Sequence, residues 1–495
     1  MATRRKLKVL FVASECTPFV KTGGLADVAG ALPPAIKEAG EKVSVVMPCY
    51  GTIPWDFIEQ LEHVADFYVP LAWRNVWCGI EHLEYKGIDY YFVDNEAYFN
   101  REAPYGYFDD GERFAFFSKA VLEAMEYVEG MQCDILHLND WQSAMAAVFL
   151  REFYMGMPLY ENIRTVFTIH NVKFQGQYSD FVLEDVLGLS GVPAARDQLY
   201  IEDKTINYMK GALCYSDALT TVSPTYAEEL KLPFFGEHLE GLFQARAGDL
   251  HGVLNGIDME EYNPATDDLI AAKYSVDDLS GKAECKRSLQ EELNLDIDPT
   301  RPLVAMVGRL TKQKGLDLVQ YAMETLMSRG IQVVVLGTGD REYEDSMRYF
   351  DWKYNRQMRA CITFDSAFSH RVYAGADLFL MPSQFEPCGL SQMIAMRYGT
   401  LPLVRETGGL VDSVNAYNEY TGEGTGFRFA NFNADEMAGV LLYACEIFWT
   451  QQDKWQNIIR QAMSVDFGWA KAADDYVDIY HSLHPEVTRY IKRRS

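Results

Sequence analysis

A glutamate stands in the second half of the chain at a position typical of an active-site acid. Glu386 follows an apolar run, residues 377–382, that is typical of a buried parallel strand. The next apolar run, residues 401–404, is followed closely by the turn Thr-Gly-Gly at 407–409. Open α/β sheets bind ligands at the carboxyl ends of their strands, so the acid and the turn are expected to meet there. A carboxylate accepts hydrogen bonds from sugar hydroxyls, and a glycine turn offers N–H groups to phosphate, which together predict a sugar-phosphate site.

A second copy of this turn lies near the N-terminus. Residues 22–28 match residues 407–413 at five of seven positions, and both segments follow a strand pattern and precede a helical one. Lys21 precedes the first turn, and Asp27 lies six residues further on, where it could orient Lys21 or simply favour the helix start. The match has two interpretations: chance similarity between glycine-rich turns, or two similar domains that face one ligand.

Cations follow the strand predicted at residues 303–307. Arg309 and Lys314 come directly after it, with Lys312 between them. Cations at a helix start oppose the helix dipole, which favours a bound anion over the alternative of a solvated basic turn. An arginine can clamp a diphosphate through two parallel hydrogen bonds, and a lysine adds a point charge.

Two strand ends in the first half also carry polar side chains. The strand predicted at 165–169 ends in His170 and Asn171, and the strand at 135–138 is followed by Asp140. A histidine at a strand end is often structural, but these three side chains could share one edge of the sheet.

Composition limits the partners. The chain has 495 residues, and 45 basic against 71 acidic side chains give a net charge of −26, which argues against nucleic acid or an anionic membrane. Nine scattered cysteines without a Cys-x-x-Cys pair fit reduced thiols in the cytoplasm. No apolar run approaches the ~20 residues of a membrane span, and residues 1–13 continue into a strand pattern that is unlike a signal peptide.

Asp296 and Asp298 form an Asp-x-Asp in a polar connection, which predicts a solvated loop and no metal site.

Strand and helix patterns alternate along the chain, which predicts an α/β fold with doubly wound sheets. Residues 51–92 look more irregular, with short strands at 67–71 and 80–91, and a further strand is predicted at 90–94. A first domain is expected over residues 1–255 and a second over 256–469, each with its own parallel sheet. The second sheet is expected to use residues 303–307, 332–336, 361–364, 378–381 and 401–404.

Five motifs in a fixed order resemble those of the glycogen and starch synthases, which are retaining glycosyltransferases that extend α-1,4-glucan from a nucleotide sugar. They are Lys-Thr-Gly-Gly-Leu at 21–25, His-Asn at 170–171, Asn-Gly-Ile-Asp at 255–258, Gly-Arg-Leu at 308–310 and Phe-Glu-Pro-Cys-Gly-Leu at 385–390. The resemblance covers nearly the whole chain. It implies the GT-B fold, two doubly wound Rossmann-like domains facing a central cleft, with the C-terminal helix, residues 470–495, joined to the first domain. Many related transferases carry a second glutamate at the position of Ile394; the synthases also lack it.

The resemblance also implies roles for individual residues. It implies catalytic roles for Glu386, His170, Asp140 and Lys21; donor binding by Lys21, Gly24, Arg309, Lys314, Glu386, Cys388, Gly389, Leu390, Thr407, Gly408 and Gly409; and acceptor or sugar contacts for Asp27, Asn171 and Asn255. The expected partners are a nucleotide sugar and an α-glucan, without a cofactor or metal ion, and an oligomer is left open. Lys-Thr-Gly-Gly-Leu is typical of the bacterial and plant branch, which implies ADP-glucose as donor and a cytoplasmic or plastid-stromal protein.

Three alternatives remain open from the residues. The same chemistry could use UDP-glucose, because no residue separates adenine from uracil. A glucan hydrolase or phosphorylase could use Asp140 and Glu386 as a carboxylate pair. A non-catalytic glucan-binding protein would be expected to have lost Glu386 or the phosphate cations, and all of them are present.

Overall fold

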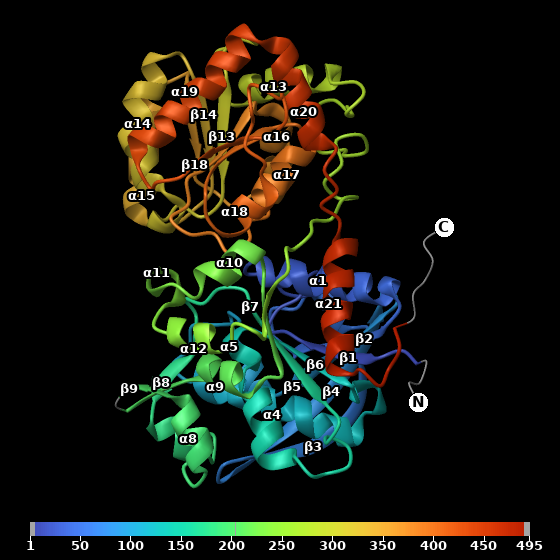
Figure 1. Cartoon of the computed structure of the whole chain (residues 1–495). Helices are drawn as coiled ribbons and strands as arrows, with labels where there is room; N and C mark the ends of the chain where they lie inside the picture. Colours follow the sequence, from blue (N-terminus) through green and yellow to red (C-terminus); the bar gives the residue numbers. More distant parts are fainter. Residues whose placement is uncertain (1–4, 203, 490–495) are drawn as a thin grey trace. The chain divides into compact units, whose positions relative to one another are not determined.

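The computed structural model describes residues 5–202 and 204–489. The chain divides into two compact units, and each is described by itself (Figure 1). The N-terminal unit comprises Met1–Val222, Ala227–Val253 and Trp469–Ser495, and the C-terminal unit comprises Ser223–Tyr226 and Leu254–Gly468.

The N-terminal unit is built on one large mixed sheet. Within its described residues, nine strands pair in the order β12-β11-β7-β6-β1-β2-β5-β4-β3. The strands are β1 (Lys8–Val12), β2 (Lys42–Pro48), β3 (Glu62–Leu71), β4 (Arg74–Tyr85), β5 (Ile88–Asp94), β6 (Ile135–Asn139), β7 (Arg164–Ile169), β11 (Ala218–Thr221) and β12 (Leu250–Gly252). All pairs from β12 to β5 are parallel, and the central strands β1 and β6 are almost wholly buried because helices cover both faces. The carboxyl ends of β1, β6 and β7 are therefore followed directly by Ala13, Asp140 and His170.

The described helices of this unit range from 4 to 18 residues in length. They are α1 (Gly24–Ala39), α2 (Trp55–Ile58), α3 (Glu96–Phe99), α4 (Asp110–Tyr127), α5 (Asp140–Ser143), α6 (Met145–Phe149), α7 (Phe181–Asp185), α8 (Pro193–Leu199), α9 (Tyr208–Tyr215), α11 (Pro233–Gly236), α12 (Glu240–Ala245) and α21 (Trp469–Leu483). The last of these, α21, packs against α1 (Figure 1). Its Tyr480 hydroxyl lies 2.6 Å from Nδ1 of the buried His137 on β6, so α21 is fixed to the sheet.

The prediction that residues 51–92 are irregular is wrong. β3 and β4 are two of the longest strands, and β3 pairs antiparallel with residues 74–82 of β4. They were predicted only in part, as short strands at 67–71 and 80–91, because they lie at the sheet edge, where exposed and buried residues alternate and no continuous apolar run exists. The single strand predicted at 80–91 is two strands, β4 and β5, joined by a tight turn in which Lys86 and Gly87 both have positive φ. A small antiparallel sheet of the described residues, β8 (Gln177–Ser179), β10 (Thr205–Asn207) and β9 (Tyr200–Glu202), was also not predicted.

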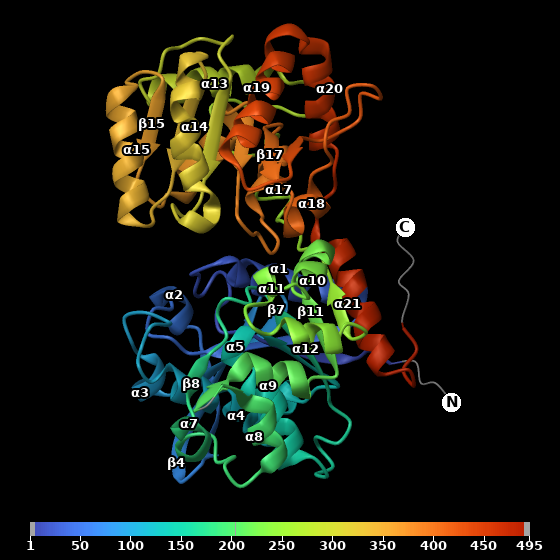
Figure 2. The same ribbon diagram turned by 60° about the vertical axis from the view of Figure 1, so that its left-hand side comes forward.

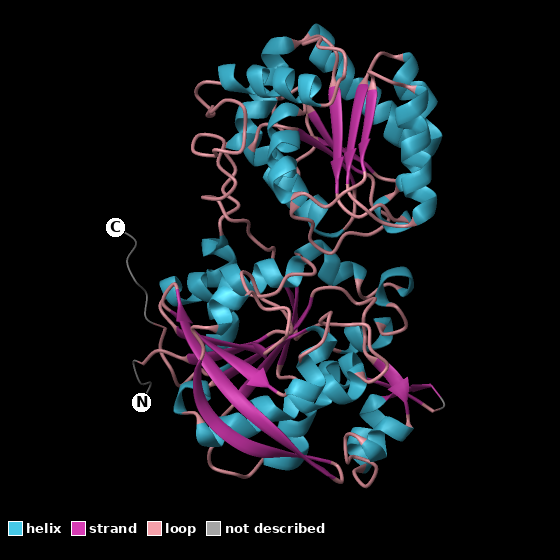
Figure 3. Ribbon diagram, turned by 180° about the vertical axis from the view of Figure 1, so that it is seen from behind, coloured by secondary structure: helices cyan, strands magenta, loops and turns pink. Residues whose placement is uncertain are grey.

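The C-terminal unit has a parallel sheet with helices on both sides (Figure 3). Among the described residues its six strands pair in the order β15-β14-β13-β16-β17-β18. They are β13 (Leu303–Val307), β14 (Gln332–Leu336), β15 (Met358–Cys361), β16 (Leu378–Met381), β17 (Leu401–Arg405) and β18 (Phe427–Phe429). The strand predicted at 361–364 is misplaced, because β15 ends at Cys361. It is an edge strand with one fully buried residue, so its apolar signal is weak.

Helices α14 and α15 run side by side on one face of this sheet (Figure 2). The helices of the unit are α13 (Ser280–Glu292), α14 (Leu316–Ser328), α15 (Arg341–Lys353), α16 (Ser366–Gly375), α17 (Ser391–Arg397), α18 (Gly408–Ser413), α19 (Ala434–Thr450) and α20 (Gln452–Met463), with a single 3-10 turn, η3, at Lys312–Lys314. Each of α14, α17 and α18 begins just beyond the carboxyl end of a strand, so three loops are available there to form a site. No helix in the described ranges is long and apolar enough to cross a membrane.

Candidate active site

The predicted site residues fall into two groups, one on each unit. In the C-terminal unit, Glu386 follows β16 and is buried, with 7% of its surface exposed. Its Oε2 lies 2.5 Å from Nζ of Lys314 and accepts a hydrogen bond from the Ser383 hydroxyl at 3.1 Å. A buried carboxylate is costly unless it is paired, so the ammonium and the hydroxyl explain how the acid is tolerated there.

Lys314 reaches Glu386 because η3 packs closely on the end of β16. Gly315 ends η3 with a positive φ of 74°, and a Cβ at this position would lie 2.1 Å from the Pro382 carbonyl oxygen. Only glycine permits both the conformation and the approach. The main chain adds a second link, because the N–H of Gln384 donates to the carbonyl of Gln313 at 2.7 Å.

The loop that carries Glu386 is also held from β17. Arg405 is the last residue of that strand and is 9% exposed. Its guanidinium donates to the carbonyl of Ser383 at 2.7 Å and to the carbonyl of Gln384. Neither Arg405 nor Ser383 was among the predicted site residues. A charged residue that ends an otherwise apolar strand was the available signal.

The second glycine turn, Thr407-Gly408-Gly409, lies directly against this loop. A Cβ at Gly408 would be 2.0 Å from the carbonyl oxygen of Glu386, and one at Gly409 would be 2.2 Å from that of Cys388. The N–H of Gly409 donates to the carbonyls of Glu386 at 3.2 Å and Pro387 at 3.1 Å. The turn and the acid therefore meet, as the strand-end rule predicts, and this N–H holds the loop in place instead of pointing free toward a ligand.

Arg309 carries a positive charge that is not used in an ion pair within the described chain. It follows β13 and Gly308, is exposed, and its guanidinium forms no ion pair with any described residue. Lys314, in contrast, is already paired with Glu386. The loop that carries Arg309 rests on residues 337–339, since the N–H of Leu310 donates to the carbonyl of Thr338 at 2.9 Å.

The remaining predicted donor contacts differ in accessibility. Cys388 is buried beside Glu386 and accepts the N–H of Asn255; burial raises the pKa of its thiol to about 12, so it is not a nucleophile at neutral pH. Oδ1 of Asn255 is itself buried without a hydrogen-bond partner in the described chain. Gly389 has a positive φ of 69° and Leu390 precedes the first residue of α17, so both shape the turn after the acid.

In the N-terminal unit, Asp140 ties the ends of β6 and β7 together. Its Oδ1 accepts the N–H of His170 at 2.8 Å, and the N–H of Asn171 also donates to the carboxylate. Burial is the largest cause that raises the pKa of Asp140, to about 7, although these two donors oppose it. Oδ1 of Asn171 accepts the N–H of Lys173 at 3.1 Å and so holds the following turn.

Asn139 determines which nitrogen of His170 carries the proton. The Nδ2 group of Asn139 donates to the carbonyl of Val12 at 2.9 Å, so its Oδ1 faces Nε2 of His170, also at 2.9 Å. An amide oxygen only accepts, so Nε2 must carry the hydrogen and Nδ1 is left as an acceptor. Burial lowers the pKa of His170 to about 3, and the ring is uncharged at neutral pH. Asn139 was not predicted, although it adjoins Asp140.

The first glycine turn carries a lysine–aspartate pair. Nζ of Lys21 lies 2.6 Å from Oδ1 of Asp27, and both side chains are partly exposed. Gly24 is exposed, and a Cβ there would meet nothing within 4 Å. The turn rests on Glu15, a buried acid that sequence reasoning missed. The charge of Glu15 also raises the pKa of Asp140, which places the two acids in electrostatic reach.

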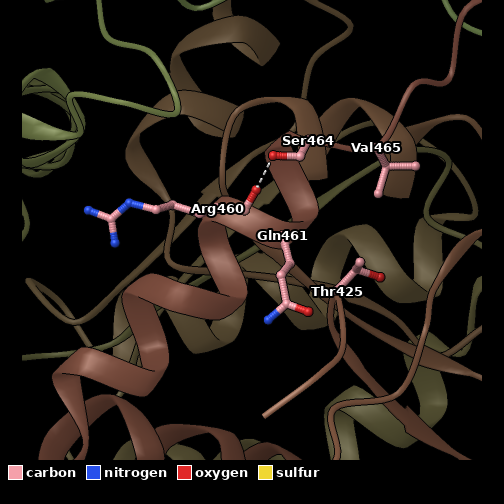
Figure 4. Close-up of a pocket in the computed structure, with 5 residues that line it drawn as sticks. All are labelled: Thr425, Arg460, Gln461, Ser464 and Val465. Carbon is pink, nitrogen blue, oxygen red and sulfur yellow. Dashed lines mark hydrogen bonds between the residues drawn. The ribbon is translucent and has the colours of Figure 1, made fainter. Parts of the chain in front are cut away.

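Other features lie apart from these groups. Asp296 pairs with Arg301 and Arg356, and Asp298 accepts hydrogen bonds from Thr300, so both acids are used within a surface loop. Within the described ranges, no group of three His, Cys, Asp or Glu side chains is arranged to hold a metal ion. A pocket of about 410 Å³ is lined by Thr425, Arg460, Gln461, Ser464 and Val465, none of them a predicted site residue (Figure 4).

Comparisons with known proteins agree with the two-unit organisation. Residues 8–245 match the family model of the starch synthase catalytic domain, and residues 290–461 match that of the group 1 glycosyl transferases. Glycogen synthase from Clostridium novyi (strain NT) is 45% identical over 482 residues, 96% of this chain and 99% of that protein. Glycogen synthase from Bacillus subtilis (strain 168) is 48% identical over 482 residues, 96% of this chain and 98% of that protein.

The chain belongs to the glycogen synthase family. The resemblance inferred from the five motifs is thereby confirmed, and the protein is a glycosyltransferase. The catalytic domain of starch synthase IV from Arabidopsis thaliana, solved with ADP and acarbose bound, superposes with a TM-score of 0.88 at 32% identity, covering 97% of this chain and 99% of that one. Sucrose-phosphate synthase from Thermosynechococcus elongatus gives a TM-score of 0.60 at 18% identity over 97% of this chain and 100% of that one, which shows the shared fold alone. The predicted GT-B fold class, with two Rossmann-like domains, is confirmed.

Proposed function

We propose that this member of the glycogen synthase family transfers glucose from ADP-glucose to the non-reducing end of an α-1,4-glucan with retention of the anomeric configuration. The observation that carries the proposal is the buried Glu386 carboxylate, paired with Lys314 while Arg309 remains exposed and unpaired. Acid and cations thus stand at the carboxyl ends of neighbouring strands in one unit. Support for the donor comes from the 32% identical starch synthase IV that was solved with ADP and acarbose.

The two kinds of charge suit the two halves of the reaction. Breaking the glycosidic bond leaves negative charge on the departing diphosphate and positive charge on the sugar. Arg309 and Lys314 offset the negative charge on the diphosphate, and Glu386 offsets the positive charge on the sugar. A carboxylate already locked in an ion pair is a poor nucleophile, so its role here is electrostatic.

The residues of the N-terminal unit suit an uncharged ligand group. Nδ1 of the neutral His170 can accept a hydrogen bond from a hydroxyl, and Asp140 fixes the backbone of His170 and Asn171. Lys21 adds a cation, held by Asp27 at 2.6 Å, for the donor. In this unit, a neutral acceptor therefore binds sugar hydroxyls, and a cation binds phosphate.

No metal ion is required in this proposal, because side-chain cations occupy the role that a divalent ion fills in Asp-x-Asp transferases. We also propose that the enzyme is cytoplasmic. All nine cysteines lie in the described part of the chain and are free thiols, which suits a reducing compartment.

A donor comparison tests the proposal. Purified protein is incubated with glycogen and either ADP-[14C]glucose or UDP-[14C]glucose at equal concentration, and label in precipitated glucan is counted. We expect incorporation from ADP-glucose at a rate well above that from UDP-glucose. A preference for UDP-glucose would overturn the donor assignment. Label recovered as free glucose would favour a hydrolase, and binding of glycogen without turnover would favour a glucan-binding protein.

A further inference from the structure

Helix α1 begins without a side-chain cap of its own. The residue that precedes it, Gly23, has no side chain, yet the first N–H groups of any helix lack partners within it. Serine, threonine, aspartate or asparagine usually supplies the missing acceptor at this position. Helix α1 instead has two consecutive glycines, Gly23 and Gly24, at its start.

The missing acceptor comes from Glu15, in the loop that follows β1. Its Oε2 accepts the N–H of Thr22 at 2.8 Å and the Thr22 hydroxyl, and the N–H groups of Gly23 and Ala26 lie close enough to the carboxylate to lower its pKa, although burial raises it more. Glu15 is 3% exposed, so these donors are what balances its buried charge. It therefore caps α1 from inside the protein, seven residues before the turn.

This arrangement leaves the outer face of the turn bare. No described residue accepts a hydrogen bond from the N–H of Gly24 or Leu25, and the space beside Gly24 is open. A Cβ at Gly23 would lie on the side of the carboxylate, 3.6 Å from Oε1 of Glu15. Glu15 thus holds the turn through Thr22, while the space beside Gly24 stays open.

The matching turn in the C-terminal unit is anchored differently. There the N–H of Gly409 donates to the main-chain carbonyls of Glu386 and Pro387, not to a carboxylate. Under the first turn lies the carboxyl group of Glu15, whose pKa is raised by burial, and its ionised form disfavours a second anion at the same helix start. Of the two turns, the first thus depends on Lys21 for any attraction to phosphate.

We propose that Glu15 is a positioning residue, which caps α1 from within and thereby fixes the turn that carries Lys21 and the two free N–H groups of Gly24 and Leu25. This inference rests on the proposed function for the role of Lys21 toward the nucleotide sugar. Glu15 itself acts only through the turn.

Amide hydrogen exchange of the wild-type protein tests the capping directly. With residue-level detection and no ligand, the amides of Thr22, Gly23 and Ala26 are expected to be protected, and those of Gly24 and Leu25 are expected to exchange at the rate of open chain. Open-chain exchange at Thr22 and Gly23 would overturn the proposal. This measurement needs no variant and so does not depend on a variant folding.

Glu15→Gln and Glu41→Gln form a matched pair for the functional test. Glu41 is also a buried glutamate of the N-terminal unit, and it accepts the N–H of Leu7 at 2.6 Å. Its other oxygen faces His481, so it has no link to the turn. We expect both variants to lower the melting temperature, but only Glu15→Gln to lower kcat/KM for ADP-glucose, by about 10- to 100-fold, as misplacement of a binding group does. Equal kcat/KM losses in the two variants would mean that Glu15 is only structural.

A double-mutant cycle with Lys21→Ala separates this inference from the proposed function. If Glu15 acts through the turn, Glu15→Gln costs much less in the Lys21→Ala background than in the wild type. A full, additive loss in that background would overturn the positioning role. An unchanged kcat/KM in Lys21→Ala alone would instead contradict the donor-binding role of Lys21, whatever Glu15 does.

Discussion

Replacing Gly409 with alanine is expected to impair catalysis by pushing the loop that carries Glu386 out of place. The added Cβ would lie 2.2 Å from the carbonyl oxygen of Cys388. The gap must open by about 0.8–1.2 Å to reach the 3.0–3.4 Å at which real contacts begin. A misplacement near 1 Å costs ~100-fold in rate, which corresponds to about 2.7 kcal/mol of barrier. Overpacking adds a loss of about 1–3 kcal/mol in the free energy of unfolding.

The assay compares Gly409→Ala with Gly439→Ala. Gly439 lies exposed on α19 in the same unit, and a Cβ there would meet nothing within 4 Å. Initial rates of ADP release at saturating glycogen give kcat/KM for ADP-glucose, and urea unfolding gives stability. We expect Gly439→Ala to keep the wild-type kcat/KM and to gain about 0.5–1 kcal/mol of stability, as helical glycine-to-alanine changes do. A Gly409→Ala enzyme within twofold of wild-type kcat/KM, with unchanged stability, would refute the close packing of turn on loop.

Further predictions concern charge at the site. Glu386→Gln should lower kcat far more than it raises KM, because the carboxylate matters most when the sugar is cationic; steady-state kinetics with near-normal kcat would remove it from the mechanism. Arg309→Ala and Lys314→Ala should each cost about 3–4 kcal/mol of transition-state stabilisation, and unchanged kcat/KM in both would exclude the phosphate clamp. Asn139→Asp places a carboxylate beside Nε2 of His170 and should raise the pKa of His170 from about 3. As the pH falls, the active neutral ring is then protonated at a higher pH than in the wild type. The acid limb of the pH–rate profile then moves to higher pH; an unmoved limb, with the His170 NMR titration also unmoved, would contradict the assigned contact. Activity should survive exhaustive chelation at constant ionic strength; loss that one divalent ion restores would show a metal requirement.

The strands that matter most to the site were predictable because they are buried on both faces. β13, β14 and β16 begin and end at the residues predicted from their apolar runs, since a central parallel strand leaves little room for polar side chains. β3 and β4 were predicted only in part, because their pairing joins exposed edge residues whose pattern carries no continuous apolar signal.

The residues of the site also differ in how well the sequence predicted them. Glu386 and Lys314 were each predicted at the carboxyl end of a strand, where ligands bind, but their ion pair at 2.5 Å was not predicted. Glu15 was missed although it also follows a strand, because it contacts the N–H and the hydroxyl of Thr22 and no cation marks it. Arg405 was missed for a related reason: it binds main-chain carbonyls, so no complementary side chain marks it.

The growth of a defined acceptor tests the central claim most directly. A maltooligosaccharide of known length is incubated with ADP-glucose labelled with 13C at the anomeric carbon, and products are followed by mass spectrometry and NMR. The account predicts chains longer by whole glucose units, an α-1,4 linkage at the non-reducing end, and one ADP released for each glucose added. Labelled free glucose in place of longer chains, or a β linkage in the product, would contradict it.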